Sequence, residues 1–546
     1  MKGQILRNRP QKDDLSLWVM ALPTIIMLLL FAYFPMFGLI LAFKDYNITK
    51  GIFKSDFVGL KNFKFLFATT DAWVITRNTV LYNLAFIVVN MVVAVMLALL
   101  LSNLRSRKTA KTLQTVYMLP YFLSWAVVAI IANAFLDRTN GFINQVVSSV
   151  GGTKSLVDWY QRPEIWPWLL VLVNAWKNVG YQTVLYLAVI SGIPQSYYEA
   201  AMLDGASKWQ QIRYITIPQL RFVMAISLIT SMASIFRGDF GLFYTVPNNS
   251  GPLYPVTDVI DTYIYRALLT NGNTGMSTAA GLYQSLVGFI LVLIVNKVVS
   301  KIDADCAMSV LMDTGVESVK KAKKRSGTAI NEISRTSNAV ITVVLILVAV
   351  LVLAPVVLMI CISFSSSASI TSNGYRFIPE EWSLEGYRYL LKMGDRLLKS
   401  YLVTIAYSVL GTALGVFLMS MYAYVIMQKS FRYHRALTWF MFFTMLFSGG
   451  LVPTYIMIVR YYHMKDTFWI LLFTGLVDAY LIVILRTFIK TTIPDALMDA
   501  AKIDGAGHFT TYFEIVLPLS KAGLGTAALF SFVAKWNDWF TGMLYI

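Results

Sequence analysis

Two polar segments, separated by 300 positions, contain the most distinctive residue pattern of the chain. The first hook, as we call it, covers residues 193–218, and the second hook covers residues 493–518. Nine of the 26 aligned positions are identical without a gap, and one acid, Glu199 or Asp499, precedes a pair of alanines in each copy. A polar pattern present twice at one internal spacing indicates an element with the same task in each half of the chain.

Each hook is predicted to form a helix, a sharp turn and a second short helix. Pro194 suits the first turn of a helix, and no helix breaker occurs in 195–203. Because glycine adopts the left-handed conformation just past a helix C-terminus, the pair Asp204-Gly205 is expected to end this helix. A second short helix is expected over about 207–215, and Pro218 then opens a membrane helix.

The second short helix of each hook is expected to have an apolar face that its own membrane domain does not bury. This face consists of Trp209, Ile212 and Ile215 in the first hook and of Phe509, Tyr512 and Ile515 in the second. Such a helix usually docks in a groove of a partner protein, and the alternative is that it lies on the lipid surface. The presence of two copies at one spacing favours the partner.

Residues typical of an enzyme site are sparse. The histidines His434, His463 and His508 are scattered without metal-ligand spacing, and Cys306 and Cys361 suggest neither a disulfide framework nor a metal cluster. The chain contains no G-x-x-x-x-G-K-[ST] phosphate loop. We therefore expect a protein that is not an enzyme, holds no metal or cofactor and does not bind ATP itself.

Composition identifies the chain as a membrane protein, since 57% of its 546 residues are hydrophobic and only 14% are charged. A membrane-spanning helix needs about 20 mostly apolar residues. Seven charge-free runs and four charge-interrupted runs reach this length, which predicts an all-α protein with eleven spans. The charge-free runs are 15–43, 78–104, 112–136, 267–296, 336–362, 400–428 and 436–459, and the interrupted runs are 165–192, 221–244, 467–489 and 521–546. The formal charge of +17 is attributed to loops on a positive cytoplasmic face rather than to nucleic-acid binding.

The distribution of lysine and arginine predicts a multi-pass plasma-membrane protein whose N-terminus and hooks face the cytoplasm. Six spans separate the halves, so the repeat is parallel, with about 6 + 5 helices. The expected organisation is a first transmembrane domain at 1–305, a cytoplasmic linker at 306–336 and a second transmembrane domain at 337–546. No counterpart of span 267–296 follows the fifth span of the second copy, so a sixth helix is expected to be missing from this chain.

The hooks resemble the EAA loop of importer-type ABC transporter permeases. Two further stretches, 441–455 (MFFTMLFSGGLVPTY) and 258–266 (DVIDTYIYR), resemble segments of permeases from oligosaccharide importers. The resemblance implies the fold of a type I importer transmembrane domain, here as a fused pair of permeases. It assigns ATPase coupling to Glu199, Ala200, Ala201, Asp204, Gly205, Ile215, Pro218, Asp499, Ala500, Ala501, Asp504, Gly505, Ile515 and Pro518.

The same resemblance implies the partners and the energy source. Two cytoplasmic ABC ATPase subunits, which bind ATP and magnesium, dock on the hooks, and an extracytoplasmic solute-binding protein delivers an oligosaccharide. Membrane lipid surrounds the chain, and no nucleic-acid partner is expected. Two rivals remain open, namely a secondary transporter driven by an ion gradient and a membrane scaffold that transports nothing.

Charged or amide side chains inside spans mark a candidate solute pathway, because such groups are costly in lipid and normally face a cavity or a partner. These candidates are Lys177, Asn178, Arg237, Asp239, Asp478, Lys535 and Asp538. The alternative for Arg237, Asp239, Lys535 and Asp538 is a purely structural pairing or a place at the membrane boundary. Neutralising Lys177 or Asp478 is predicted to lower solute flux without lowering the protein level.

Overall fold

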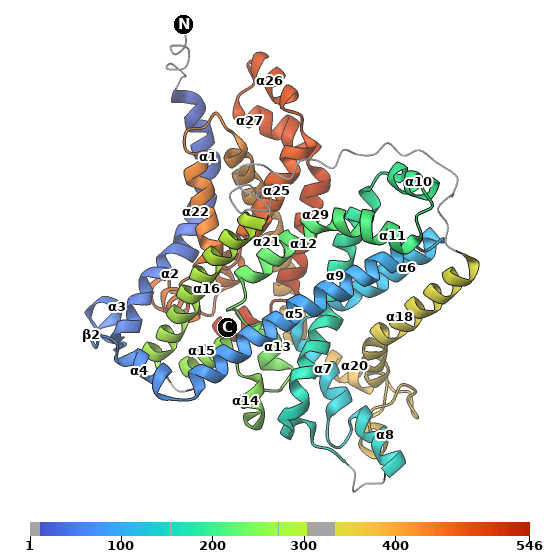
Figure 1. Ribbon diagram of the computed structural model, residues 1–546. Helices are drawn as coiled ribbons and strands as arrows, with labels where there is room; N and C mark the ends of the chain where they lie inside the picture. Colours follow the sequence, from blue (N-terminus) through green and yellow to red (C-terminus); the bar gives the residue numbers. More distant parts are fainter. Residues whose placement is uncertain (1–10, 152–155, 271, 303–333) are drawn as a thin grey trace. The chain divides into compact units, whose positions relative to one another are not determined.

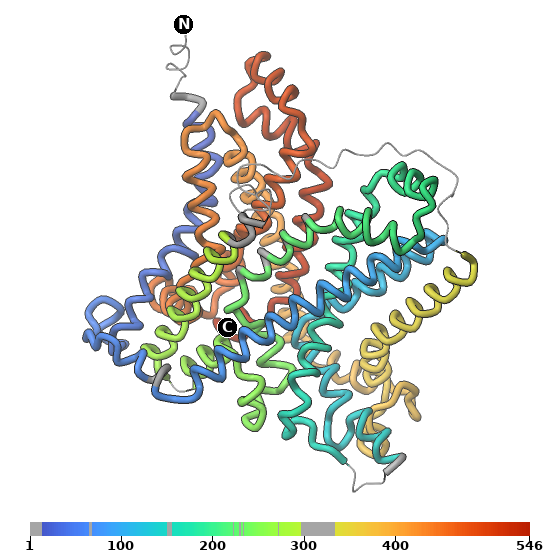
Figure 2. The backbone as a smooth tube through the Cα atoms, in the orientation of Figure 1, coloured from blue at the N-terminus to red at the C-terminus, as the bar shows by residue number. Residues whose placement is uncertain are grey.

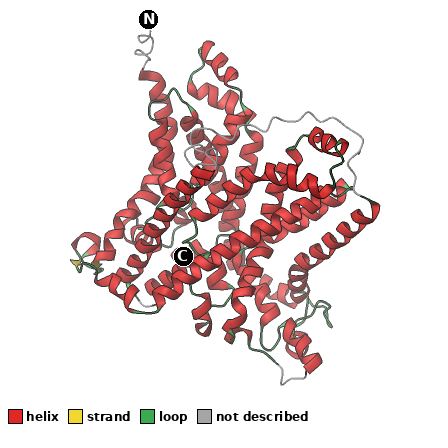
Figure 3. Ribbon diagram, viewed as in Figure 1, coloured by secondary structure: helices red, strands yellow, loops and turns green. Residues whose placement is uncertain are grey.

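The structure, a computed structural model, describes residues 11–151, 156–270, 272–302 and 334–546. The described chain is helical almost throughout (Figure 3), which confirms the predicted all-α class. Its two strands, β1 (Lys44–Asp45) and β2 (Asp56–Phe57), pair antiparallel. The predicted linker 306–336 lies outside the described residues except for 334–336 at its end.

The chain forms two compact units. Unit 1 comprises the described residues within 1–68, 264–318 and 400–546, and unit 2 comprises those within 69–263 and 319–399. Each unit therefore contains one hook. Each also combines most of one sequence repeat with the first membrane helix of the other repeat, and unit 1 contains in addition residues 274–302 of the first repeat.

Unit 1 is a bundle of membrane helices with a small module at one end. Its helices are α1 (Gln11–Leu28), η1 (Leu29–Tyr33), α2 (Phe34–Phe37), η2 (Gly38–Phe43), α3 (Gly51–Lys54), α4 (Lys61–Ala68), α16 (Thr274–Ile302), α21 (Asp395–Met427, from residue 400), α22 (His434–Leu446), α23 (Leu451–Ile456), η10 (Met457–Tyr461), α24 (Phe468–Phe473), α25 (Ala479–Thr492), α26 (Asp495–Ile503), α27 (His508–Thr510), η11 (Thr511–Val516), α28 (Leu517–Leu519), α29 (Lys521–Trp536) and α30 (Phe540–Tyr545). Helix α15 (Ile260–Leu269) crosses from unit 2 into unit 1.

The first helix of the chain packs among helices of the second repeat. The hydroxyl of Thr24 in α1 donates to the carbonyl of Leu418 in α21 over 3.1 Å, and the Tyr33 hydroxyl donates to the carbonyl of Phe440 over 2.7 Å. In Figure 1 and Figure 2, the start of α1 lies at the same end of unit 1 as α26 and α27, and the β1–β2 module lies at the opposite end. The sides of the membrane that the N-terminus and the second hook face stay a prediction.

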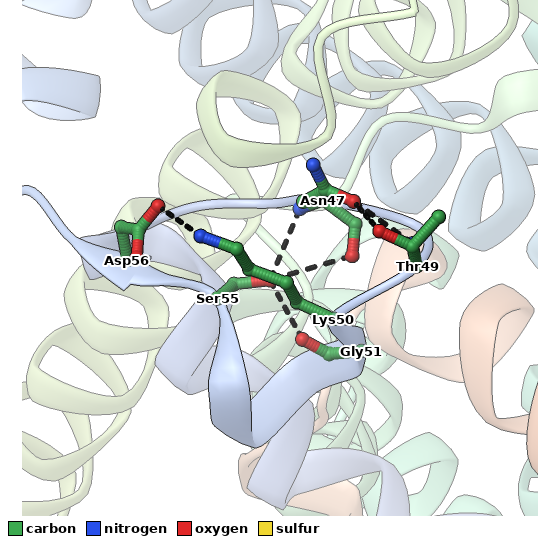
Figure 4. A network of polar contacts seen from close by, with 6 residues as sticks. All are labelled: Asn47, Thr49, Lys50, Gly51, Ser55 and Asp56. Carbon is green, nitrogen blue, oxygen red and sulfur yellow. Dashed lines mark hydrogen bonds and ion pairs between the residues drawn. The ribbon is translucent and has the colours of Figure 1, made fainter.

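The β1–β2 module, residues 44–57, is held by short polar contacts shown in Figure 4. The Ser55 hydroxyl donates to the carbonyl of Gly51 over 2.6 Å and accepts from the backbone N–H of Asn47 over 3.0 Å. An exposed ion pair of 2.7 Å joins Lys50 to Asp56. Local hydrogen bonding of this kind gives the lysine-rich segment after the first span a defined turn.

Unit 2 is built on two long helices that pack along each other, α5 (Asp71–Ser102) and α9 (Trp166–Gly192). The other elements are α6 (Arg107–Met118), η3 (Leu119–Phe122), α7 (Trp125–Leu136), α8 (Phe142–Gly151), η5 (Trp159–Gln161), η6 (Pro163–Ile165), α10 (Gln195–Leu203), α11 (Lys208–Gln211), η7 (Ile212–Thr216), α12 (Ile217–Ala233), α13 (Phe240–Thr245), η8 (Gly251–Leu253), α14 (Tyr254–Thr257), α18 (Arg335–Ser363), α19 (Ser367–Asn373) and α20 (Glu385–Lys392).

Helix α18, the first helix of the second repeat, packs on α6 and α7 of unit 2. The Tyr117 hydroxyl donates to the carbonyl of Leu345 over 2.7 Å, and the Trp176 indole N–H donates to the carbonyl of Val352 over 3.0 Å. The hook helices α10 and α11 lie at the same end of unit 2 as the starts of α6 and α18, with α8 and α20 at the other end (Figure 1). In each unit, the first membrane helix of one repeat thus packs against helices of the other repeat.

Five helices among the described residues are long and apolar enough to cross a membrane: Asp14–Phe43, Asp71–Ser102, Thr274–Val295, Arg335–Ser363 and Asp395–Met427. Three further candidates are pairs of helices bent at a break, by 98° after Phe122, by 108° after Leu446 and by 78° after Leu519. The predicted runs 112–136 and 436–459 each contain one of these breaks. Treating each run as one continuous span was wrong, and the count of eleven spans stays a prediction.

Candidate functional site

The first hook folds as its turn residues predict. Helix α10 covers Gln195–Leu203, the same residues as the predicted helix, and Gly205 follows it with φ +79°. The backbone N–H of Gly205 donates to the carbonyl of Met202 over 3.0 Å, and that of Ala206 donates to the carbonyl of Ala201 over 2.8 Å. This pair of bonds closes the helix end in the way a left-handed glycine allows.

The second hook repeats this geometry. Helix α26 covers Asp495–Ile503, Gly505 has φ +78°, and the backbone N–H of Ala506 donates to the carbonyl of Ala501 over 2.9 Å. The identical Asp-Gly-Ala residues of the two segments therefore build identical turns.

Both hooks return to the membrane through a wide helical turn just before a proline. The wide turns are η7 and η11, and Pro218 and Pro518 follow directly in the next helices. Proline lacks the backbone N–H and clashes with the carbonyl four residues earlier, so a wider turn relieves both problems. The prediction that these prolines open the next helix is confirmed.

The tips of the hooks expose large apolar side chains. Leu203 is 90% exposed and Ile503 is 85% exposed, and they occupy the same position immediately before the Asp-Gly pair. Glu199 and Asp499 are also exposed, and neither forms an ion pair with another residue that the structure describes. An exposed apolar knob beside an acid has the features of a docking surface.

The predicted apolar face of the second short helix is only partly exposed. Trp209 and Phe509 are exposed, but Tyr512 is fully buried, with its hydroxyl 2.6 Å from that of Ser420 in α21. A second contact joins the Tyr424 hydroxyl to Nδ1 of His508 over 3.0 Å. The expectation that Tyr512 belongs to an open face was wrong, because its hydroxyl finds a partner in the neighbouring membrane helix.

A cavity of about 500 Å³ lies within unit 2. Its walls come from α5, α9, α12, η3 and the segment between α12 and α13. The lining residues are Asn83, Phe86, Ile87, Asn90, Met91, Tyr121, Asn174, Asn178, Tyr181, Gln182, Tyr186, Ser227, Leu228, Ser231, Ser234, Arg237, Gly238 and Asp239. Amides, hydroxyls and aromatic rings thus dominate a chamber walled by membrane helices.

The amides of this cavity are only partly engaged with the protein. Asn90, 6% exposed, donates from Nδ2 to Oδ1 of Asn174 over 2.9 Å. Its own Oδ1 has no hydrogen-bond partner among the described residues. A buried amide oxygen without a donor is costly, and the residue that carries this one lies in the wall of the cavity.

The rings of Tyr121 and Tyr181 stack in the cavity wall, with centroids 4.7 Å apart and planes 13° apart. Tyr121 belongs to η3, directly at the 98° break after Phe122. The position of one cavity-lining ring is therefore set by the geometry of the break.

Comparisons with known proteins identify the family of this chain. The family model described as "Binding-protein-dependent transport system inner membrane component" matches residues 90–304. Protein LplB of Bacillus subtilis (strain 168) is 33% identical over 298 residues, which cover 54% of this chain and 91% of LplB. The chain belongs to this family. The polygalacturonan/rhamnogalacturonan transport system permease protein YteP of the same strain is 34% identical over 285 residues, covering 52% of this chain and 88% of YteP.

A solved structure is also similar to this binding-protein-dependent permease. One chain of a bacterial ABC transporter involved in the import of the acidic polysaccharide alginate shares 32% identity, with a TM-score of 0.49. The alignment covers 54% of this permease and 97% of that chain.

The family match contains the first hook and all cavity-lining residues of the permease from Asn90 onward. The family description names a membrane component of a transport system, in agreement with the expectation that the chain is not an enzyme. It does not favour the ion-gradient alternative. The second hook lies outside the matched residues, so its likeness to the first rests on the internal repeat and on the observed turn.

The structure brings three of the seven predicted pathway residues of the permease together, because Asn178, Arg237 and Asp239 line the cavity. Lys177 does not line it. Its ammonium donates to the carbonyls of Tyr121, over 3.1 Å, and of Leu123.

The remaining candidates lie in unit 1. Asp478 caps the start of α25 by accepting from the backbone N–H of Tyr480 over 2.7 Å. Lys535 is buried, and Asp538 accepts from the Tyr407 hydroxyl over 3.1 Å. The coupling and pathway roles of all these residues stay predictions.

Sequence reasoning missed most of the polar lining. Asn174, Asn178 and Gln182 recur every four residues on α9, and Ser227, Ser231 and Ser234 lie on one face of α12 and its end. Polar residues at helical spacing inside a span indicate a face turned away from lipid. Uncharged amides and serines at this spacing were the available signal, and of these residues only Asn178 was predicted.

Proposed function

We propose that the chain is the permease of an ATP-driven carbohydrate importer and that it combines a pair of permease domains in one polypeptide. An alignment over nearly the whole length of LplB uses only about half of this chain, and each unit contains one hook. The observation that carries the proposal is the identical turn, φ +79° at Gly205 and +78° at Gly505, behind an equally exposed apolar tip.

Each hook is proposed to dock in a cytoplasmic ABC ATPase subunit, which holds ATP and magnesium. The exposed tip residue fills an apolar pocket of the ATPase, and Glu199 or Asp499 pairs with a basic side chain there. The N-terminus and both hooks then face the cytoplasm, and an extracytoplasmic binding protein delivers the solute at the opposite end. Closure of the ATPases on ATP moves the two hooks and alternates access to the pathway.

The proposed solute is an oligosaccharide, and the polar cavity of unit 2 supports this class. Amide and serine side chains pair with sugar hydroxyls, while the stacked rings of Tyr121 and Tyr181 offer an apolar surface for a sugar ring. The name of YteP, a polygalacturonan/rhamnogalacturonan permease, points to the same class.

The decisive experiment reconstitutes the chain in liposomes with candidate ATPase and binding-protein subunits and measures ATP hydrolysis and sugar uptake. Gly205→Pro and Gly505→Pro are expected to abolish the stimulated hydrolysis, because proline cannot adopt a positive φ. Gly251→Pro, at a glycine outside the hooks, is the control. Undiminished stimulation in both hook variants contradicts the proposal, and uptake that collapses with an uncoupler but survives removal of the ATPases supports a secondary transporter instead.

A further inference from the structure

Two of the predicted membrane spans, 112–136 and 467–489, are interrupted at breaks that leave backbone carbonyls without their helical partners. In unit 2, η3 ends at Phe122 and α7 begins at Trp125, with a bend of 98° between the helices. In unit 1, α24 ends at Phe473 and α25 begins at Ala479, with Gly475 at φ +66° between them. Carbonyls freed in this way need donors from other elements.

A buried lysine from a neighbouring helix supplies those donors in unit 2. Lys177 of α9 is 8% exposed, and its ammonium donates to the carbonyls of Tyr121, over 3.1 Å, and of Leu123. A longer contact of 3.5 Å reaches the carbonyl of Pro120, which already accepts from the backbone N–H of Leu123. The ammonium also lies 5.2 Å from the ring centroid of Trp125, the first residue of α7. One side chain therefore contacts both sides of the break.

A second buried lysine lies beside the break in unit 1. Lys535 of α29 is 5% exposed and donates to the carbonyl of Gly475 over 3.2 Å. Its ammonium lies 5.3 Å from the ring centroid of Tyr407 in α21. A Cβ at Gly411 would lie 2.9 Å from Cδ of Lys535, so the glycine leaves room for the lysine stem.

Each lysine interacts electrostatically with an aspartate in the segment after the fifth span of its repeat. Asp239 accepts from the backbone N–H of Leu242, over 3.3 Å, at the start of α13 and interacts electrostatically with Lys177. Asp538 accepts from the backbone N–H of Thr541, over 3.0 Å, next to α30 and interacts electrostatically with Lys535.

We propose that Lys177 and Lys535 are positioning residues, each holding the break of an interrupted membrane helix by donating hydrogen bonds to its free carbonyls. The inference rests on the proposed transport function, because the break in unit 2 carries Tyr121 into the cavity wall. Asn178, the next residue along α9, lines the cavity, whereas Lys177 does not. Lys177 therefore acts on the pathway through the backbone of the break rather than by touching the solute.

The test measures the geometry of the break directly, in the full chain in lipid nanodiscs without solute or ATPase. Nitroxide labels on Lys111→Cys and Ile130→Cys flank the break in a Cys306→Ser, Cys361→Ser background, and double electron–electron resonance reads their distance distribution. Lys177→Met, which keeps the length of the side chain but removes its donors, is expected to broaden the distribution about twofold, because the freed carbonyls lose their partners. Lys177→Arg, which keeps donors, is expected to restore most of the original width.

Two controls separate the carbonyl contacts from other roles of the lysine. Asn178→Ala removes the neighbouring cavity amide and is expected to leave the width unchanged. The double variant Lys177→Met/Asp239→Asn removes both charges, so it avoids an unpaired carboxylate and stays folded, yet it is expected to remain as broad as Lys177→Met. A narrow distribution in Lys177→Met, or a return to the narrow one in the double variant, overturns the proposal.

Lys535→Met is tested in the same way with labels on Trp469→Cys and Thr491→Cys, which flank the break of unit 1. If Lys177→Met does not insert stably into the membrane, the width of the distance distribution in unit 2 is taken from the double variant. Because the measurement needs no transported solute, its failure leaves the proposed function intact, and failure of transport leaves the measurement valid.

Discussion

The hydroxyls of Tyr512 and Ser420 lie 2.6 Å apart and join the second hook to membrane helix α21. Tyr512 is fully buried at this contact. A force applied to the hook by a docked partner is therefore passed to α21 through a short polar bond and a packed ring.

Tyr512→Phe removes the hydroxyl and keeps the ring. The free energy of unfolding is expected to fall by only about 1 kcal/mol, the usual contribution of one hydrogen bond. The ATPase should still bind, whereas hydrolysis stimulated by the loaded binding protein should drop severalfold, since hook and helix no longer move as one body. Tyr214→Phe, at an exposed tyrosine of the first hook, is the control. Stimulation equal in the two variants contradicts this prediction.

The apolar tips offer a direct test of docking. Leu203→Asp and Ile503→Asp place a charge at the two most exposed apolar positions of the hooks. Each is expected to weaken binding of the ATPase subunits at least tenfold, because an unpaired charge is costly to bury in an apolar pocket. Binding is measured by surface plasmon resonance on the purified chain. Ile378→Asp changes a similarly exposed isoleucine outside the hooks and should have no effect; equal losses in all three variants indicate general damage instead of docking.

Substitution of Asn90 tests whether the cavity of unit 2 binds the solute. Asn90→Leu keeps the size of the side chain but removes its amide, including the donor to Asn174, so the cavity wall offers a bound sugar fewer polar partners. We expect the KM for uptake to rise about tenfold, with the protein level unchanged. The matched control is Asn103→Leu, an asparagine at the end of the same helix that donates to the carbonyl of Leu99 and does not line the cavity. A KM that stays constant in Asn90→Leu removes this residue from the solute pathway.

Gly180 tests the packing of α9 against α6. A Cβ at this position would overlap the backbone carbonyl of Tyr117, which cannot yield like the end of a flexible side chain. Gly180→Ala is expected to cost about 1–3 kcal/mol, as over-packing usually does, and to lower the melting temperature in detergent. Gly525→Ala, in a helix with open space around the glycine, should instead be neutral or stabilising. Similar melting temperatures for the two variants refute the close approach.

The hooks were predictable because their fold is encoded locally. A proline, nine residues without a breaker and an Asp-Gly pair determine the helix and its end, and α10 covers the predicted residues. The neighbours of Tyr512 were not predictable in this way, because Ser420 lies 92 residues earlier in the chain.

The breaks in the interrupted spans were not predicted from the sequence. An apolar run such as 112–136 meets the length criterion for a continuous helix, and nothing in its hydropathy marks the break after Phe122. The donors that stabilise the break come from Lys177 on another helix. The prediction that charged and amide side chains inside spans line the pathway therefore grouped Lys177 with Asn178, although the two side chains have different surroundings.

The exchange of first helices has a consequence for biosynthesis. Thr24 in α1 bonds to a carbonyl 394 residues further along the chain, and Tyr117 bonds to one 228 residues further along. When α1 enters the membrane, its partner helices have not yet been translated, so neither unit is complete until the second repeat emerges from the ribosome. Each repeat consequently supplies packing partners that the other repeat needs. A polypeptide released after the first repeat would keep α1 exposed to lipid and to quality-control proteases.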